Sequence, residues 1–443
     1  MTIPANSGRI TAMAEPYIKT YYRETLCNNK ERPALDSDID TEICVIGGGL
    51  AGLSTALGLI EKGKKVTLIE ANRIGWGASG RNGGFVAKGY ACSYDKLVKS
   101  VGIDHTRQLH QLARSGRRLI KDRIDKYNID CGPVVDGVLG VSWIDDERGV
   151  KDYIEFMQRD LNVSLEFWPK EKVRQHCKTA QYFDGFYSKE DYQFHPLNYV
   201  HGLAQAIEEG GGSIYEATKA EKIDDAGGGY VVHTPQGKIK CDQVVLCCSI
   251  YVDGLNKKLH YASFPVYTYV MVTKPIPEEL LNQSLNTNHA IFDNRYAQDY
   301  YRRLPDNRIL WGGRVSVTGI PDDLADIMIK DLLKIYPQLE GIAEPDYAWG
   351  GKLCYAPHKM PQIGQLKPGY WYNTCFGGHG LVPTSVGGDV VSSAIAEGDE
   401  RYKLFAPFSK LWFAGGPLSP YIAQSVYYMW RARDYLMSIK KAA

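Results

Sequence analysis

Residues 42–70 read EICVIGGGLAGLSTALGLIEKGKKVTLIE, and this stretch decides the fold. The short apolar run at 43–46 predicts a buried parallel strand, and residues 50–62 have the length and pattern of a helix. A second apolar run at 66–69 predicts the neighbouring parallel strand. A strand, a glycine turn, a helix and a second strand in this order form the βαβ unit that is typical of dinucleotide-binding proteins.

The glycines of the turn carry the most specific signal in this stretch. Gly47, Gly49 and Gly52 follow the G-x-G-x-x-G spacing, which allows a sharp turn, a close approach to a pyrophosphate and tight packing of helix on strand. The helix N-terminus then directs its N–H groups at the phosphates. Glu70 ends the second strand, where an acid binds the ribose hydroxyls. The alternatives are a coincidental glycine turn in another α/β protein and a surface acid at position 70.

Composition narrows the class of protein. A length of 443 residues, with 44% hydrophobic residues, favours about two domains with sizeable cores. The net charge of +1 gives no reason to expect nucleic acid or an anionic membrane as a partner. We find no apolar run long enough for a transmembrane segment and no secretion signal, and ten scattered cysteines lack metal-ligand spacing. We therefore expect a cytoplasmic protein with reduced thiols and no metal.

A second turn and helix near the C-terminus help to choose between cofactors. A strand at 371–376 is followed by Gly378, His379 and Gly380 and by a helix predicted at 381–397. Partial positive charge at that helix N-terminus would stabilise an anionic reduced flavin. Because only one complete glycine fingerprint is present, we expect one bound dinucleotide and electrons that come from the substrate itself.

The remaining patterns predict two interleaved domains. The fold class is α/β, α+β overall, with a Rossmann-like dinucleotide-binding domain interleaved with a substrate domain on a mainly antiparallel sheet. The expected segments are an N-terminal arm at 1–40, the dinucleotide-binding domain at 41–95, 188–262 and 350–443, and the substrate domain at 96–187 and 263–349.

Four further stretches carry a family resemblance. They are GWGASGRNGG at 75–84, YYRRLPDNRILWGGR at 300–314, WGGKLCYAPHKMPQIG at 349–364 and FGGHGLVPTSVGG at 376–388. With the fingerprint they resemble the D-amino-acid-oxidase-like (DAO) family of FAD amine oxidases, and within it the γ-glutamylputrescine oxidase group. The resemblance implies the DAO, or glutathione-reductase-2-like, arrangement and an FAD held by the Rossmann-like domain. It also implies oxidation of the C–N bond of an amine to an imine, with O2 reduced to H2O2.

Some positions depart from the family pattern. Phe85 stands where relatives commonly have Gln, and His358 stands where they usually have Asp. Both are expected near the flavin or its pocket, so the substrate can differ from γ-glutamylputrescine. Cys354 does not align with the flavin-linked cysteine of sarcosine oxidases, and we therefore expect non-covalent FAD.

The resemblance and the motifs together nominate two sets of site residues. The expected FAD-binding residues are Gly47, Gly49, Gly52, Glu70, Ser79, Arg81, Asn82, Ala220, Gly378, His379 and Gly380. The expected substrate-binding residues are Arg302, Tyr267, Tyr269, Tyr301, Phe85 and His358. Arg302 is nominated because a planar guanidinium suits a carboxylate, although only one of Arg302 and Arg303 can face the pocket. Each of these residues has an alternative role. The tyrosines can equally be core-packing residues, Arg81 can be a solvated loop residue, and His379 can be a structural histidine.

No catalytic residue is assigned, because burial alone favours the neutral amine and the cofactor carries the chemistry. Two rival functions stay open. One is a flavin dehydrogenase that passes electrons to a quinone or a carrier protein, and the other is a flavin-binding accessory protein without activity. The sequence predicts no oligomeric state.

Overall fold

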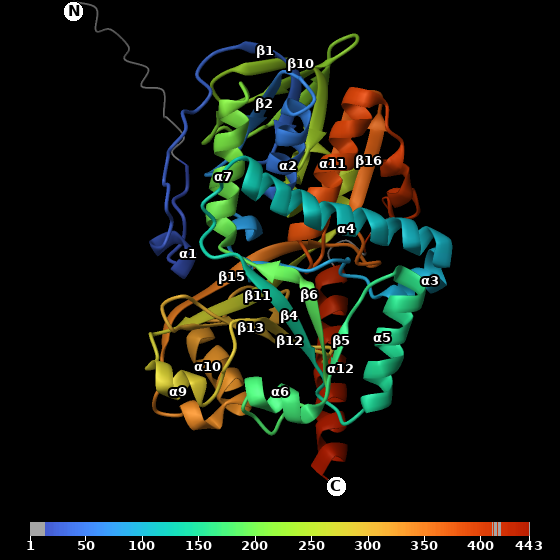
Figure 1. Ribbon diagram of the computed structural model, residues 1–443. Helices are drawn as coiled ribbons and strands as arrows, with labels where there is room; N and C mark the ends of the chain where they lie inside the picture. The colour runs from blue at the N-terminus through green and yellow to red at the C-terminus, as the bar shows by residue number, and fades with distance from the viewer. Residues whose placement is uncertain (1–13, 410, 412–413, 415–417, 443) are drawn as a thin grey trace, which may run out of the picture.

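Two β-sheets, one above the other in Figure 1, organise the computed structural model. The structure describes residues 14–409, 411, 414 and 418–442. The upper sheet is largely parallel, and the lower sheet is largely antiparallel. This arrangement confirms the predicted fold class.

The parallel sheet contains the βαβ unit that the fingerprint predicts. Its strands run in the order β16-β17-β10-β1-β2-β7, with the hairpin β8–β9 attached to β10. The bounds are β1 (Ile39–Ile46), β2 (Val66–Ile69), β7 (Ser213–Tyr215), β8 (Lys222–Asp225), β9 (Tyr230–His233), β10 (Lys238–Leu246), β16 (Gln362–Lys367) and β17 (Tyr370–Thr374). Because β1 pairs in parallel with both β2 and β10, its carboxyl end lies at the centre of one sheet edge.

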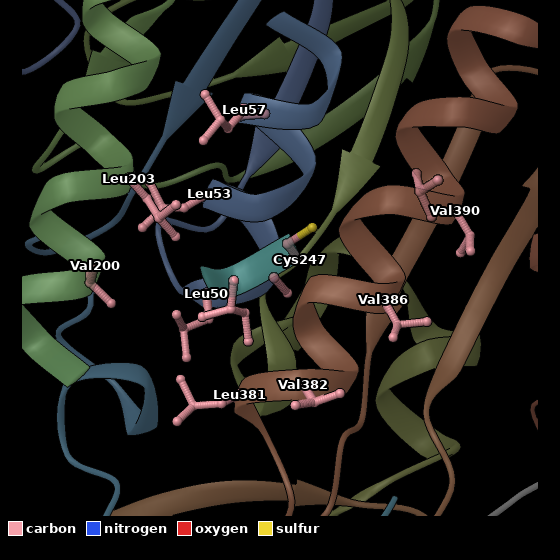
Figure 2. Packing of buried hydrophobic residues seen from close by; sticks show 14 of the residues in the cluster. Leu50, Leu53, Leu57, Val200, Leu203, Cys247, Leu381, Val382, Val386 and Val390 are labelled. Atoms are coloured by element: carbon pink, nitrogen blue, oxygen red, sulfur yellow. The ribbon is translucent and has the colours of Figure 1, made fainter. Parts of the chain in front are cut away.

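Helices cover this sheet and bury its largest core. They are α2 (Leu50–Ile60), α7 (Pro196–Glu209), α11 (Leu381–Glu397) and α4 (Ile103–Lys126). Figure 2 shows α2 between α7 and α11, with the side chains of Leu53, Leu203 and Val386 among those that fill the space between them. A Cβ at Gly52 would lie 1.8 Å from the carbonyl oxygen of Gly47, so only glycine lets α2 begin this close to the turn.

The antiparallel sheet has the order β15-β11-β14-β13-β12-β4-β6-β3, with β5 paired to β6. Its strands are β3 (Phe85–Val86), β4 (Val135–Val141), β5 (Glu166–Trp168), β6 (Gly185–Gln193), β11 (Phe264–Thr273), β12 (Ala290–Asp293), β13 (Tyr300–Arg303), β14 (Ile309–Ser316) and β15 (Pro345–Tyr355). The pairing of β12 with β4 is parallel. Helix α10 (Leu324–Ile335) packs on one face of β11, β14 and β15, and the opposite face is free to form the wall of a site.

Other helices complete the chain. They are α1 (Tyr21–Glu24), α3 (Tyr94–Val101), α5 (Glu147–Leu161), α6 (Lys170–His176), α8 (Lys257–Tyr261), α9 (Glu278–Asn282) and α12 (Ser419–Ala442). No helix of the described chain combines the length and the apolar character that crossing a membrane requires. All ten cysteines are free thiols.

The division into two domains remains a prediction, and several elements lie across its proposed boundaries. Strands β3 and β15 pair in the antiparallel sheet, although 85–86 and 350–355 fall in segments that we assign to the dinucleotide-binding domain. Helix α4 packs on α11 and α7, although 103–126 falls in a substrate-domain segment. Helix α12 contacts β11, so it lies beside the antiparallel sheet.

Candidate active site

One large cavity of about 1450 Å³ lies between the two sheets. Its upper wall is formed at the carboxyl ends of β1, β2 and β10, where Ile46, Ile69 and Cys247 line it. Ligands of open α/β sheets bind at this edge. Pockets that bind drug-sized ligands have volumes of roughly 300–1,000 Å³, so this cavity is large enough for a dinucleotide and a substrate together.

The first glycine turn and Glu70 form one end of this cavity. Gly47 has φ +114°, and a Cβ there would lie 2.7 Å from the Cys247 carbonyl oxygen. The Glu70 carboxylate accepts hydrogen bonds from the N–H groups of Gly48 (2.6 Å) and Asn72 (2.9 Å). Burial raises the pKa of Glu70, while these two bonds act in the opposite direction. Glu70, Gly47, Gly49 and Ala220 all line the cavity.

The loop at 75–84 lies beside the N-terminus of α2. Ser79 Oγ accepts a hydrogen bond from the Leu50 N–H at 2.9 Å, which leaves the hydroxyl proton free to bind an anion. Asn82 donates to the Ser79 carbonyl at 2.8 Å and accepts from the Gly84 N–H at 2.9 Å. Asn82 therefore shapes the loop with its amide while also lining the cavity.

Arg81 faces the cavity with part of its guanidinium unsatisfied. Nη1 donates to the Gly350 carbonyl at 3.3 Å, whereas Nη2 is buried without a hydrogen-bond partner among the described residues. The guanidinium lies over the Trp76 ring at 4.6 Å. Burial lowers the pKa of Arg81, as expected when a cation loses water without gaining an acid. An anionic group in the cavity would satisfy it.

The N-terminus of α11 faces the cavity from the other side. Gly380 is its N-cap and no side chain caps it, so its first N–H groups remain available to a ligand. His379 Nε2 lies 2.7 Å from the Ala87 carbonyl oxygen and therefore carries the proton. Burial lowers the pKa of His379, which favours the neutral ring. Gly378, His379 and Gly380 all line the cavity.

The lower wall of the cavity is aromatic and comes from the antiparallel sheet. The Phe85 and Tyr300 rings meet at 5.5 Å in an edge-to-face contact, and both line the cavity together with Tyr355. Val266 and Thr268 of β11 also line it. Phe85 thus lies where the sequence places it, and Tyr300 is a wall residue that the sequence reasoning missed.

Three tyrosines nominated for the substrate pocket lie on the opposite face of the sheet. Tyr267 and Tyr269 alternate with the cavity-facing Val266 and Thr268 and pack in the core beside α10. Tyr301 stacks on Trp311 with ring centroids 4.4 Å apart. The prediction of these residues as pocket walls is wrong, because successive strand residues point to opposite faces and the other parity faces the cavity.

The prediction that Arg302 lies in the substrate pocket is also wrong. It is 5% exposed and does not line the cavity. Its guanidinium donates to Gln193 Oε1 (2.8 Å), the Phe194 carbonyl (3.0 Å) and Tyr22 Oη (3.2 Å). Arg302 therefore fastens β13 to the end of β6 and to α1 through both terminal nitrogens of its guanidinium, while Nε is buried without a partner among the described residues.

His358 lies in a turn behind the cavity wall. Its Nδ1 accepts from the Met360 N–H at 3.1 Å, and its ring packs against Phe408 at 5.7 Å. The neighbours Pro357 and Lys359 line the cavity, but His358 does not. The prediction of His358 as a substrate residue is therefore corrected, because the ring is engaged in the turn and does not line the cavity.

Several polar and aromatic wall residues escaped the sequence reasoning. Lys352 lies over the Tyr251 ring at 5.4 Å, and Lys359 lies over the Trp430 ring at 4.3 Å. Among the described residues neither lysine forms an ion pair with an acid, and burial lowers the pKa of Lys359. Tyr427, next to Trp430 on α12, also lines the cavity. Lys352 lies inside the quoted stretch 349–364, but nothing in its pattern marks it as pocket-facing.

Comparison with known proteins agrees with this geometry. The family model described as "DAO: FAD dependent oxidoreductase" matches residues 42–394. The chain is 34% identical to the gamma-glutamylputrescine oxidoreductase of Escherichia coli K12, over 90% of this chain and 94% of that one. It is 32% identical to a probable oxidoreductase OrdL of Haemophilus influenzae, over 88% and 91% of the two chains.

Solved structures share the fold. Glycine oxidase from Bacillus cereus superposes with a TM-score of 0.68 at 21% identity, covering 82% of this chain and 97% of that one. At that identity the likeness concerns the fold alone. The family match spans most of the chain and includes both glycine turns and the arginine loop. The chain therefore belongs to the DAO family of FAD-dependent oxidoreductases.

Proposed function

We propose that this protein oxidises the C–N bond of an amine that also carries a carboxylate, with γ-glutamylated amines as the first class to test. The observation that carries the proposal is the single cavity that joins the glycine turn and Glu70 to the aromatic wall of Phe85, Tyr300 and Tyr355. The name of the Escherichia coli relative supports the choice of γ-glutamylated amines.

FAD is the cofactor of this family, and the cavity residues fit it. The buried, unpartnered Nη2 of Arg81 requires an anionic or acceptor group beside it. A Cβ at Gly49 would lie 2.9 Å from Ser79 Oγ, so only glycine lets the turn lie this close to the Ser79 hydroxyl. The uncapped α11 N-terminus provides N–H donors. We propose that FAD is held without a covalent bond, and acid precipitation should release all of the yellow colour into solution.

The residues around the substrate would act by excluding water. Bound FAD supplies a two-electron acceptor for the hydride that leaves the carbon next to the amine nitrogen. Phe85, Tyr300 and Val266 form an apolar wall, and desolvation there favours the neutral amine that can donate its lone pair. The product imine takes up water and splits into a carbonyl compound and an amine. In our proposal O2 receives the two electrons together with two protons and becomes H2O2.

Lys352 is our candidate partner for the substrate carboxylate. It is one of the residues that line the cavity, its amine lies over the Tyr251 ring, and it is paired with no acid among the described residues. Lys352→Gln should raise KM for a carboxylate-bearing amine by about 10-fold or more, the loss of one charge-assisted hydrogen bond, and should change KM for a neutral amine little. Lys222→Gln, on the exposed hairpin β8–β9, is the control. Equal changes for both substrates would remove Lys352 from recognition.

Anaerobic reduction of the bound flavin tests the proposed function. The purified yellow protein is mixed with a library of amines and amino acids that includes γ-glutamyl polyamines, and bleaching of the flavin is recorded. Bleaching by carboxylate-bearing amines, followed by H2O2 formation in air, supports the proposal. Bleaching without peroxide identifies a dehydrogenase that uses another acceptor, and no bleaching by any amine identifies a non-catalytic flavoprotein.

A further inference from the structure

Helix α12 exposes an apolar surface. Seven large apolar side chains at the start of this helix and along it are each between 60% and 68% exposed: Leu418, Tyr421, Ile422, Tyr428, Met429, Tyr435 and Leu436. Figure 1 shows α12 running along the lower half of the molecule toward the C-terminus. Isolated exposed apolar residues are ordinary, but a contiguous set marks an interaction surface.

The spacing of these residues places them on one side of the helix. Tyr421 and Ile422 follow Leu418 by three and four residues, and the pairs Tyr428–Met429 and Tyr435–Leu436 each follow after a further seven. Because seven residues are close to two helical turns, these side chains form a stripe along the axis. At about 1.5 Å per residue the stripe is roughly 27 Å long. We call this surface the α12 stripe.

The opposite side of α12 is fixed to the protein. Asp434 is buried and accepts hydrogen bonds from the N–H groups of Tyr296 (3.1 Å) and Ala297 (2.9 Å). Gln424 accepts from the Val317 N–H at 2.9 Å, and Tyr427 is buried. Because these contacts hold the inner side in place, the helix cannot turn the stripe inward without breaking them.

Charge is distributed unevenly around this helix. Residues 418–442 contain four Lys and Arg but one acid, Asp434, whereas the whole chain has 52 basic and 51 acidic residues. The whole-chain net charge of +1 therefore hides a C-terminal helix of net charge +3. Arg431 and Arg433 are exposed and stand on either side of the stripe by helical geometry, while the single acid is turned inward and bonded.

We propose that the α12 stripe binds the surface of an anionic lipid bilayer, with its apolar side chains inserted and its arginines at the headgroups. Helices that lie in the plane of a membrane combine an apolar face with flanking Lys and Arg. Tyr421, Tyr428 and Tyr435 suit this boundary, because each has an apolar ring and a polar hydroxyl. A second copy of this chain is the other possible occupant. It is disfavoured because paired helices would bring Arg431 and Arg433 together without an acid to offset them.

Flotation with vesicles tests this proposal on the intact FAD-loaded protein. We expect it to float with vesicles of equal parts phosphatidylcholine and phosphatidylglycerol at about 0.1 M NaCl, and several-fold less at about 0.5 M, because salt screens the arginines. Pure phosphatidylcholine vesicles should bind much less. Flotation that is the same with both vesicle types, or absent with both, overturns the proposal.

Two variants separate the membrane contact from general folding defects. Tyr428→Gln/Met429→Gln/Leu436→Gln replaces side chains that do not line the cavity with a good helix former, and should abolish flotation while FAD content stays at the wild-type level. Arg148→Gln/Lys151→Gln on the exposed side of α5 is the matched charge control and should float like the wild type. If wild-type protein sediments as a dimer, the triple variant as a monomer, and neither floats, the stripe is a contact between copies of this chain and the proposal is wrong.

Discussion

At the scale of single residues, Arg81 shows how a side chain can be arranged for a ligand. Its guanidinium is stacked on Trp76 and partly bonded to Gly350, but Nη2 has no partner among the described residues. A buried cation in this state costs free energy until an acceptor arrives. This cost is present in the free protein and is removed when an acceptor on the cofactor binds Nη2, so it favours retention of the cofactor.

Arg81→Gln should weaken FAD binding by about 10- to 100-fold, since one hydrogen bond to a charged group contributes about 1.5–3 kcal/mol. Fluorescence titration of the stripped protein with FAD measures the dissociation constant. Arg148→Gln, on the exposed surface of α5, is the control and should match the wild type. An unchanged dissociation constant for Arg81→Gln would show that the guanidinium does not contact the cofactor.

Arg302 differs from Arg81 because both of its terminal nitrogens already donate to protein atoms and it does not line the cavity. Arg302→Ala should destabilise the protein by about 2–4 kcal/mol, since it leaves the buried acceptors on Gln193 and Phe194 without a donor. Chemical denaturation measures the loss. The ratio of KM values for carboxylate-bearing and neutral amines should stay unchanged, and a selective rise for the carboxylate-bearing amine would return Arg302 to a role in recognition.

At the scale of elements, α7 begins with a histidine cap that depends on pH. His195 Nδ1 accepts from the Asn198 N–H at 3.0 Å, which requires a neutral ring. Burial and the nearby Arg302 lower the pKa of His195 to about 3, against about 6.5 in an unfolded chain. Below pH 6.5 the unfolded state therefore binds a proton that the folded state does not, and stability falls as the pH falls.

His195→Asn should retain the cap and remove this titration. The free energy of unfolding of the wild type should fall between about pH 6 and pH 4 more steeply than that of the variant, by about 1.4 kcal/mol per pH unit. Urea denaturation across this range gives the two slopes. His260→Asn, at an exposed position of α8, should keep the wild-type slope, and equal slopes for all three proteins would contradict the assignment.

Elements with a local signal were predicted well from the sequence, and those set by tertiary packing were not. The bounds 381–397 for α11 are confirmed, because a glycine turn and a closing glycine mark both ends. In β11 the sequence does not distinguish the two faces, because Val266 faces the cavity while Tyr269 packs beside α10. When a strand is covered on both faces, its residues do not alternate between polar and apolar, so the sequence does not show which face lines the cavity. Helix α12 was missed for a related reason, since its outward side is as apolar as its inward side.

At the scale of the whole molecule, the cavity joins both sheets, so its ligand should stabilise both. Removal of FAD should lower the melting temperature, since a ligand at 100 times its dissociation constant stabilises the folded state by about 2.7 kcal/mol. Differential scanning calorimetry of the loaded and stripped protein measures this shift. Returning FAD should restore it in a single transition. A transition of the antiparallel sheet that does not respond to FAD would contradict a shared site.

The walls of this cavity come from residues far apart along the chain, from Gly47 near the start to Gly380 near the end. A ribosome adds roughly 5–20 residues per second, so synthesis must continue for tens of seconds after the first glycine turn before α11 exists. Nascent chains that still lack α11 should therefore be colourless, and flavin loading should be one of the last events in the biogenesis of this protein. In a cell short of riboflavin, the species that accumulates would be a full-length chain with an open, hydrated interior, which is the form most exposed to proteases.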